Sequence, residues 1–148
     1  MFRMSKKLLY AIEAVVDIAY NAGSLPVQSK DITERQGIPR RYLEQVLQQL
    51  VRAGILTGVR GPRGGYLLAR ERRRITVGEI TRVVGLGDTE EATEPPSDLG
   101  HKVVWPMWTG FEAEMMGRLD AVTVEDLCLR ANAAGIRSEA AERLDFII

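Results

Sequence analysis

Polar side chains that could bind nucleic-acid bases are concentrated in one short stretch of the sequence. They follow Pro39 and are Arg40, Arg41, Tyr42, Glu44 and Gln45. Arginine can pair with the edge of guanine or with a phosphate, glutamate can accept from the amino group of cytosine, and glutamine can pair with adenine. The hydroxyl of Tyr42 can reach a phosphate. The same stretch could instead be an ordinary solvated helix face in which Arg40 and Glu44 form an i,i+4 ion pair.

A glycine-rich turn supplies a second set of residues with suitable chemistry for DNA. The set consists of Arg60, Gly61, Pro62, Arg63, Gly64, Gly65 and Tyr66. Arg60 and Arg63 could follow the phosphate backbone or enter the minor groove, whose negative potential attracts arginine. Gly64 and Gly65 carry no side chain that would hold the backbone away. A nucleotide-phosphate loop would need a lysine followed by serine or threonine, which this turn lacks. A hairpin with only a structural role would not explain the two arginines at its tip.

The start of the sequence is also basic. Arg3, Lys6 and Lys7 surround Ser5, a residue suited to cap a first helix. The unpaired N–H groups and the positive dipole end of that helix could hold a DNA phosphate. The alternative for these residues is a basic start that is simply solvated.

The 148 residues carry no net charge, but the two halves of the sequence differ strongly. Residues 1–74 hold 14 Lys and Arg against 6 Asp and Glu, a net charge of +8, and residues 75–148 hold the reverse, −8. A basic half that contains both polar clusters is expected to face an anionic polymer. A lone histidine and no nucleophile–base pair argue against an enzyme. Because no apolar run approaches the roughly 18 residues of a membrane span, we expect a cytoplasmic protein without membrane contact.

The periodicity of apolar residues predicts the elements that would position these side chains. Helices are expected at 5–21, 29–35 and 39–53, a hairpin with strands at 55–59 and 66–69, and further helices at 77–84, 106–119, 124–134 and, weakly, 137–148. The expected fold class is therefore mainly α with a small β-hairpin wing, a winged helix-turn-helix followed by a long C-terminal dimerisation helix. The expected divisions are a DNA-binding domain at 1–84, an acidic sensor or connector loop at 85–105, and dimerisation and C-terminal helices at 106–148.

Large apolar side chains crowd the predicted long helix. They are Trp105, Met107, Trp108, Phe111, Met115, Met116 and Leu119. These residues could form a core within one chain. We favour an interface between two copies, because exposed apolar patches of that size are unusual on monomers.

Four blocks of sequence together resemble a known family. They are Glu34 to Ile38, Tyr42 to Gln45, Val59 to Tyr66 and Ile75 to Ile80. With them, roughly residues 3–133 closely resemble the IscR/NsrR/CymR family of bacterial transcription regulators. The resemblance implies a winged-helix domain, a long helix that pairs two subunits, and a homodimer that reads palindromic double-stranded DNA. It also implies DNA contacts from the third helix and from the glycine-rich turn, in which Arg63 replaces a more usual glycine.

Many members of that family hold an iron–sulfur cluster through three cysteines in the loop before the long helix, and this sequence departs from that pattern. Residues 85–100 contain no cysteine, and the acidic residues there are Asp88, Glu90, Glu91, Glu94 and Asp98. The candidate metal ligands are therefore His101, Asp98, Glu13 and the single cysteine, Cys128. Three interpretations stay open: a clusterless protein with a solvated connector, a [2Fe–2S] cluster with these atypical ligands, and an acidic loop that binds a small effector or divalent metal.

The residues and the resemblance together predict a homodimeric DNA-binding transcription regulator that represses genes of iron–sulfur or redox metabolism. The helix at 39–53 would enter the major groove, and the hairpin would contact the backbone or the minor groove. The competing hypothesis is a winged-helix module that binds a protein partner and no DNA. In that case Arg40, Arg60 and Arg63 would be dispensable.

Overall fold

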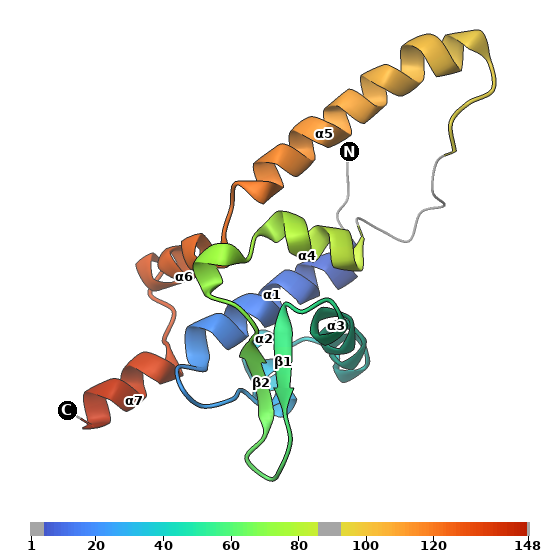
Figure 1. The fold of residues 1–148 in the computed structure, drawn as a ribbon. Coiled ribbons are helices and arrows are strands. Elements are labelled where there is room, and N and C mark those ends of the chain that lie inside the picture. Colours follow the sequence, from blue (N-terminus) through green and yellow to red (C-terminus); the bar gives the residue numbers. More distant parts are fainter. Residues whose placement is uncertain (1–4, 86–92, 148) are drawn as a thin grey trace.

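The computed structural model describes residues 5–85 and 93–147 (Figure 1). Arg3, Asp88, Glu90 and Glu91, which the sequence marks as candidate site residues, lie outside the described residues. The elements, in chain order, are α1 (Lys6–Asn21), α2 (Ser29–Gln36), α3 (Arg40–Arg52), β1 (Leu56–Val59), β2 (Gly65–Leu68), the short 3₁₀ helix η1 (Arg72–Arg74), α4 (Val77–Val84), the π-helix η2 (Gly100–Val104), α5 (Trp105–Asp120), α6 (Val124–Ala133) and α7 (Glu139–Ile147). This mainly helical fold with one antiparallel hairpin confirms the predicted fold class.

Local signals place most helix boundaries where the sequence predicts them. The Ser5 side chain accepts a hydrogen bond from the Leu8 backbone N–H at 3.1 Å and so begins α1. Gly37, in the left-handed conformation at φ +66°, ends α2. Thr123 and Asp126 form a reciprocal capping box at the start of α6, and the hydrogen bonds from the Thr123 backbone and side chain lower the pKa of the Asp126 carboxyl.

The hydrophobic core surrounds α1, which packs against α2, α3, α4, α6, α7 and β2. Fully buried residues come from five helices and include Leu8, Val15, Ile18, Ile32, Leu43, Leu47, Leu50, Ile80 and Val124. On α1 and α3 they recur at helical spacing, so each helix turns one apolar stripe inward. The core therefore unites the predicted DNA-binding segment with α6 from the acidic half of the chain.

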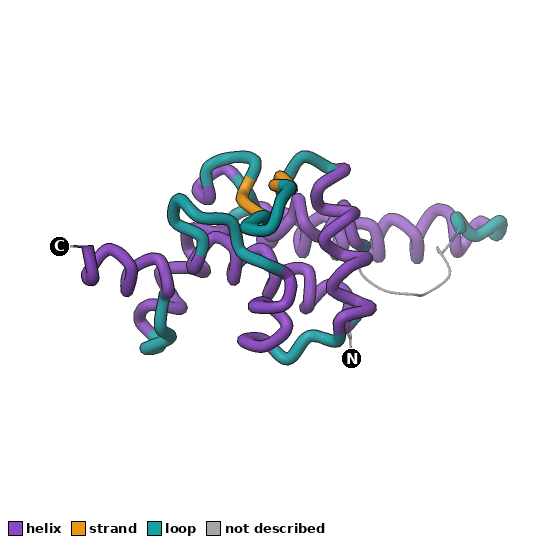
Figure 2. The backbone as a smooth tube through the Cα atoms, turned by 90° about the horizontal axis from the view of Figure 1, so that it is seen from below, coloured by secondary structure: helices purple, strands orange, loops and turns teal. Residues whose placement is uncertain are grey.

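Helix α5 is an arm that leaves this body. Figure 1 shows it extending away from α4, and the view from below in Figure 2 shows it on the side of the body opposite α7. None of its residues is buried within the chain. The apolar residues that crowd the arm therefore do not form a core within one chain, which removes one of the two sequence-based interpretations.

The helical path of the arm is longer than the sequence predicts. Pro106 lies in the first turn of α5 as expected, but η2 joins α5 directly, so residues 100–104 are helical and not part of a loop. In η2 the Trp105 N–H donates to the Gly100 carbonyl, the wider spacing of a π turn. Proline cannot donate and its ring crowds the preceding turn. A wider turn immediately before Pro106 lets the helix continue through a residue that normally starts one.

A buried carboxylate fastens α2 to α1. The Asp17 side chain has no solvent exposure and accepts from Arg35 at 2.9 and 2.8 Å and from the Gln36 amide at 2.8 Å. Arg35 also donates to Glu139 at 3.0 Å, at the start of α7. One guanidinium thus joins three helices.

The segment around α7 is held to the end of α1 by further polar contacts. The Ser138 hydroxyl donates to the Tyr20 carbonyl at 2.6 Å, and the Asn21 side chain accepts from the Glu139 N–H at 3.0 Å. Arg143 donates to the carbonyls of Asn21 and Ala22 at 2.8 and 2.7 Å. These carbonyls belong to the last turn of α1 and would otherwise lack helical partners.

We expect the substitution Asp17→Ala to lower the free energy of unfolding by about 3 kcal/mol, because it removes a fully buried carboxylate and leaves Arg35 with Glu139 as its remaining ion-pair partner. Urea denaturation measures this change. Asp98→Ala is the matched control: its side chain is 91% exposed, and its loss should change stability by less than about 0.5 kcal/mol. Similar small effects for both variants would contradict the role assigned to Asp17.

Candidate DNA-binding surface

The first turns of α3 separate an inward apolar face from an outward polar one. Leu43, Val46 and Leu47 are buried in the core, whereas Arg40, Arg41, Glu44 and Gln45 are exposed. The Arg40 Nε and a Glu44 carboxylate oxygen lie 3.1 Å apart, so the predicted i,i+4 pair is present. Their side chains are 85% and 56% exposed. Such an exposed pair contributes little and can reorganise around a ligand.

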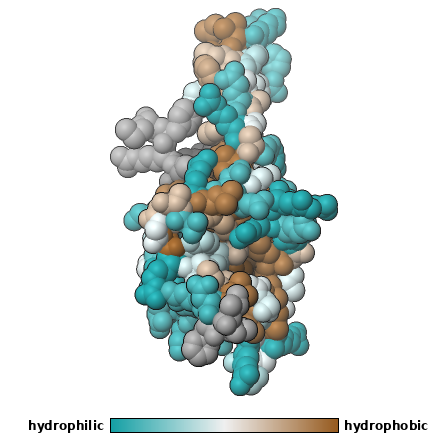
Figure 3. Space-filling model, turned by 90° about the vertical axis from the view of Figure 1, so that its left-hand side faces the viewer, coloured by the Kyte–Doolittle hydropathy of each residue, from teal (hydrophilic) through white to brown (hydrophobic). Residues whose placement is uncertain are grey.

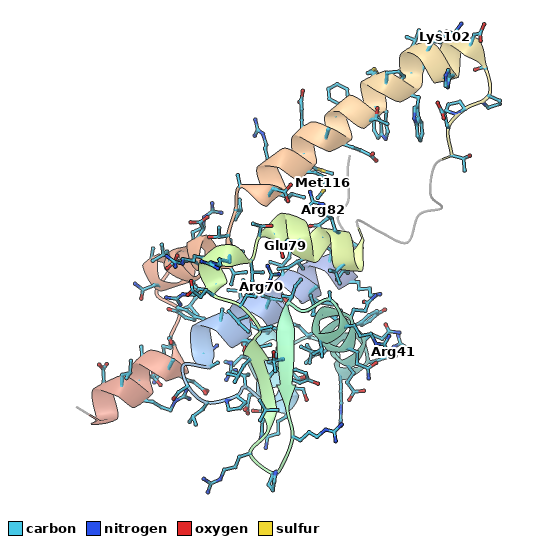
Figure 4. All side chains as sticks on the ribbon, in the orientation of Figure 1. Arg41, Arg70, Glu79, Arg82, Lys102 and Met116 are labelled. Carbon is cyan, nitrogen blue, oxygen red and sulfur yellow. The ribbon has the colours of Figure 1, made fainter. Side chains whose placement is uncertain are left out.

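Two aromatic contacts connect the first turn of α3 with α1 and with Arg41. The Arg41 guanidinium lies 5.2 Å from the centre of the Tyr42 ring, and the Tyr42 ring lies 5.9 Å from that of Tyr10 on α1. Figure 4 shows Arg41 on the outer side of α3. Lys6 precedes Tyr10 by one helical turn, so the basic start of α1 adjoins this end of α3. Sequence reasoning did not identify Tyr10, because an aromatic residue on an apolar stripe carries no signal of its partner.

The hairpin forms a wing beside α3. Strands β1 and β2 pair from Leu56 opposite Leu68 to Val59 opposite Gly65, and Arg60, Pro62 and Arg63 at its tip are exposed. The side-chain amide of Gln28, the residue before α2, donates to the Pro62 carbonyl at 3.4 Å. Gln28 therefore ties the wing tip to the helix-turn-helix, an interaction that the sequence does not indicate.

Gly64 and Gly65 are required by close contacts inside the chain, whatever their role toward DNA. A Cβ atom on Gly64 would lie 2.1 Å from the Val59 carbonyl oxygen, so the tight turn requires its absence. A Cβ atom on Gly65 would lie 2.4 Å from the Val27 carbonyl oxygen. That carbonyl accepts from the Tyr66 N–H at 2.8 Å and the Tyr66 carbonyl accepts from the Val27 N–H at 3.0 Å. Gly64 thus permits the turn of the wing, and Gly65 lets the wing dock against the segment before α2.

The candidate metal ligands are not brought together within one chain. Near the far end of the arm, His101 pairs with Glu94, and the Asp98 Oδ1 lies 3.8 Å from the Lys102 Nζ. Cys128 lies on the buried side of α6 and is 3% exposed, and Glu13 lies on α1. Among residues 5–85 and 93–147, no three His, Cys, Asp or Glu side chains are grouped to hold a metal ion.

This donor set does not fit an iron–sulfur cluster of the usual kind. Cysteine thiolates are the normal ligands of such clusters, and the chain contains one cysteine. Burial raises the pKa of the Cys128 thiol, although the charge and hydrogen bond of Arg72 act in the opposite direction. Burial also raises the pKa of the Glu13 carboxyl. Both shifts favour the neutral forms, which are poorer metal ligands.

The arm exposes a line of apolar side chains. Val103, Met107 and Phe111 follow one another at intervals of four and are 58%, 52% and 55% exposed, so they share one face of the helix. Figure 3 shows apolar surface at the end of the arm, next to hydrophilic surface. Within the described part of the chain, no helix has the length and apolar character needed to cross a membrane.

Comparison with known proteins gives one consistent family. Residues 4–130 match the family Rrf2, described as an iron-dependent transcriptional regulator. The HTH-type transcriptional regulators IscR of Cronobacter sakazakii and Klebsiella pneumoniae are 35% identical over 130 residues, which cover 84% of this chain and 79% and 78% of theirs. These relatives are transcription regulators, in agreement with the expectation that the chain is not an enzyme.

Solved structures agree with the sequence comparison. T. potens IscR superposes with a TM-score of 0.74 at 36% identity and covers 89% of this chain and 90% of its own. CymR (YrzC), the global cysteine regulator of B. subtilis, superposes with a TM-score of 0.69 at 28% identity and covers 88% and 98%.

The burial of Cys128 predicts that its thiol is unreactive in the folded protein. Only the thiolate is a nucleophile, and a raised pKa keeps the thiol protonated at neutral pH. We expect a maleimide to label the native protein far more slowly than the same protein in denaturant, as followed by intact mass. Equal labelling rates in the two conditions would show that Cys128 is accessible and ionised.

Proposed function

Because this chain belongs to the Rrf2 family of DNA-binding transcription regulators, we propose that it binds palindromic DNA as a homodimer, with α3 in the major groove and the wing on the backbone or in the minor groove. The observation that carries this proposal is the pairing of an exposed polar face on α3 with exposed arginines on a wing that is tied to the same helix-turn-helix. B-DNA's major groove admits one α-helix, whose first residues meet the base edges.

The residues of this surface have distinct roles in the proposal. Arg40, Arg41, Glu44 and Gln45 face the base edges, while Tyr42, stacked beneath Arg41, orients that guanidinium and offers its hydroxyl to a phosphate. On the wing, Arg60 and Arg63 bind the backbone or enter the minor groove. Lys6 and Lys7, in the first turn of α1 after its cap Ser5, bind a further phosphate next to α3.

The exposed apolar face of the arm supports the proposed dimer. Burial of a single side chain such as Met107 or Phe111 contributes about 1.5–3 kcal/mol, and the chain itself buries no residue of α5. A second copy offers the same face, so two arms can pair about a two-fold axis. Residues 1–84 then act as the reading domain, residues 85–105 as the connector, whose last part η2 continues into the arm, and residues 106–148 as the dimerisation and C-terminal part.

The physiological role is proposed from the relatives. The family is described as iron-dependent, and the CymR relative as a cysteine regulator. We propose that this chain represses genes of iron–sulfur or redox metabolism in the bacterial cytoplasm, where a dimer on its operator would block transcription. No step in this proposal uses an iron–sulfur cluster, since the described donor residues do not fit one.

The double substitution of Arg60 and Arg63 by alanine tests the wing. We expect weaker DNA binding, and a slope of log K against log salt that falls by about 1 for each phosphate that the variant no longer binds. Fluorescence anisotropy across a salt titration measures both. Arg137→Ala is the control, because it also removes an exposed arginine, in this case one paired with Glu142 after α6. Unchanged affinity and slope in the double variant would remove the wing from the DNA interface.

The substitution Phe111→Glu tests the dimer. A carboxylate in the centre of the proposed interface should weaken dimerisation by about 2–4 kcal/mol, so light scattering at micromolar concentration should show monomers. Glu112→Gln alters a neighbouring exposed side chain and should leave the dimer intact. A wild-type protein that is monomeric under the same conditions would contradict the proposal directly.

A further inference from the structure

The arm is joined to the body by a two-bond ion pair at its root. Asp120 is the last residue of α5, and its two carboxylate oxygens accept from the two terminal nitrogens of Arg82 on α4 at 2.7 and 2.6 Å. A guanidinium and a carboxylate that meet through two parallel hydrogen bonds fix orientation as well as distance. Helix α4 is the body helix that α5 packs against.

A glycine makes room for this pair. A Cβ atom on Gly78, in the first turn of α4, would lie 1.8 Å from the Asp120 Oδ1 and 3.0 Å from the Asp120 backbone nitrogen. The end of the arm therefore rests directly on the backbone of α4. Any side chain at position 78 would push the carboxylate out of its place beside Arg82.

Backbone hydrogen bonds hold the chain immediately after the arm. The Val77 N–H donates to the Val122 carbonyl at 2.9 Å, and the Val124 N–H donates to the Ile75 carbonyl at 2.8 Å. Both the end of α5 and the start of α6 are thus fixed to the start of α4. The Arg82–Asp120 pair lies beside these bonds and, together with the packing of α5 on α4, can restrain the tilt of the arm.

The ion pair also continues toward the wing. Glu79, one turn along α4 from Arg82, contributes to the raised pKa of Arg82 after the larger effect of Asp120. Glu79 in turn pairs with Arg70, two residues after β2. Figure 4 labels Arg70, Glu79 and Arg82 together with Met116 of the arm, all near the junction of α4 and α5. Alternating charges therefore connect the root of the arm with the outgoing strand of the wing.

From this geometry we propose that Arg82, Asp120 and Gly78 form a rigid joint that sets the angle between arm and body, and thereby selects the spacing between the two halves of the DNA site. The inference rests on the proposed dimeric DNA binding and names positioning residues, none of which touches DNA. Sixteen residues of α5 span about 24 Å at 1.5 Å per residue. A tilt of about 10° at the root then moves the far end by roughly 4 Å, about one base-pair step.

The test measures binding to a selected palindromic operator and to derivatives with one or two base pairs added to or removed from its centre. We expect the wild-type protein to prefer one spacing by about tenfold or more, the scale of one mismatched base pair. Arg82→Ala, Asp120→Ala and Gly78→Ala should remain dimers but bind several spacings with similar affinity. The charge-exchanged pair Arg82→Asp with Asp120→Arg should recover part of the preference.

Two further variants keep the outcome decisive. Arg82→Lys retains the charge without the two-bond geometry, and its preference among operator spacings is measured if the alanine variants do not fold. Arg137→Ala breaks an exposed ion pair elsewhere and should prefer the same spacing as the wild-type protein. If the Arg82, Asp120 and Gly78 variants are dimers and still prefer one spacing as strongly as the wild-type protein, the proposed role of these three residues is wrong. A wild-type protein that binds no duplex or forms no dimer would overturn the proposed function instead.

Discussion

The buried carboxylate of Asp17 is the constraint on which the arrangement of the helix-turn-helix depends. A charge without solvent contact is tolerated only when it is paired and hydrogen-bonded, and Asp17 meets this condition through Arg35 and Gln36 at the end of α2. Because α2 leads through Gly37 directly into α3, that pairing helps to position α3, the helix proposed to read DNA. Arg35 extends the same constraint to α7 through Glu139.

Different interactions stabilise the body of the protein and position the arm. The body has a continuous apolar core around α1, which packs against helices from both halves of the chain. The arm has no buried residue, and its position depends on the packing of α5 on α4 and on polar contacts at the root. Because α5 is a long helix held to the body at one end, a small change in its angle at Asp120 produces a large displacement of its far end. This arrangement would suit the proposed dimer, whose two DNA-binding domains must lie at a defined separation.

Basic side chains and candidate metal ligands are distributed differently along the chain. The basic half of the chain contains α1 to α3 and the wing, while the acidic half contains the arm. The family is described as iron-dependent, yet the one cysteine of this chain is buried on the inner side of α6, and His101 near the far end of the arm is paired with Glu94. The chain thus shares the fold of its transcription-regulator relatives, whereas its candidate metal ligands are not grouped among the described residues.

The sequence by itself determined the order, type and approximate limits of the elements, because the signals are local. Ser5, Gly37 and Thr123 cap or end helices through contacts within a few residues, and the apolar stripe of α3 shows which of its side chains stay outside. The exposed candidates on α3 and at the wing tip could be selected on that basis.

Only the tertiary structure decided which distant residues meet. Gly65 is needed because Val27 approaches it, Gly78 because Asp120 rests on it, and Asp17 is buried because Arg35 and Gln36 lie within reach. A sequence pattern identifies the face of an element but not its partner, since the partner depends on how the elements pack. The reason for each of these residues therefore became visible only in the folded chain.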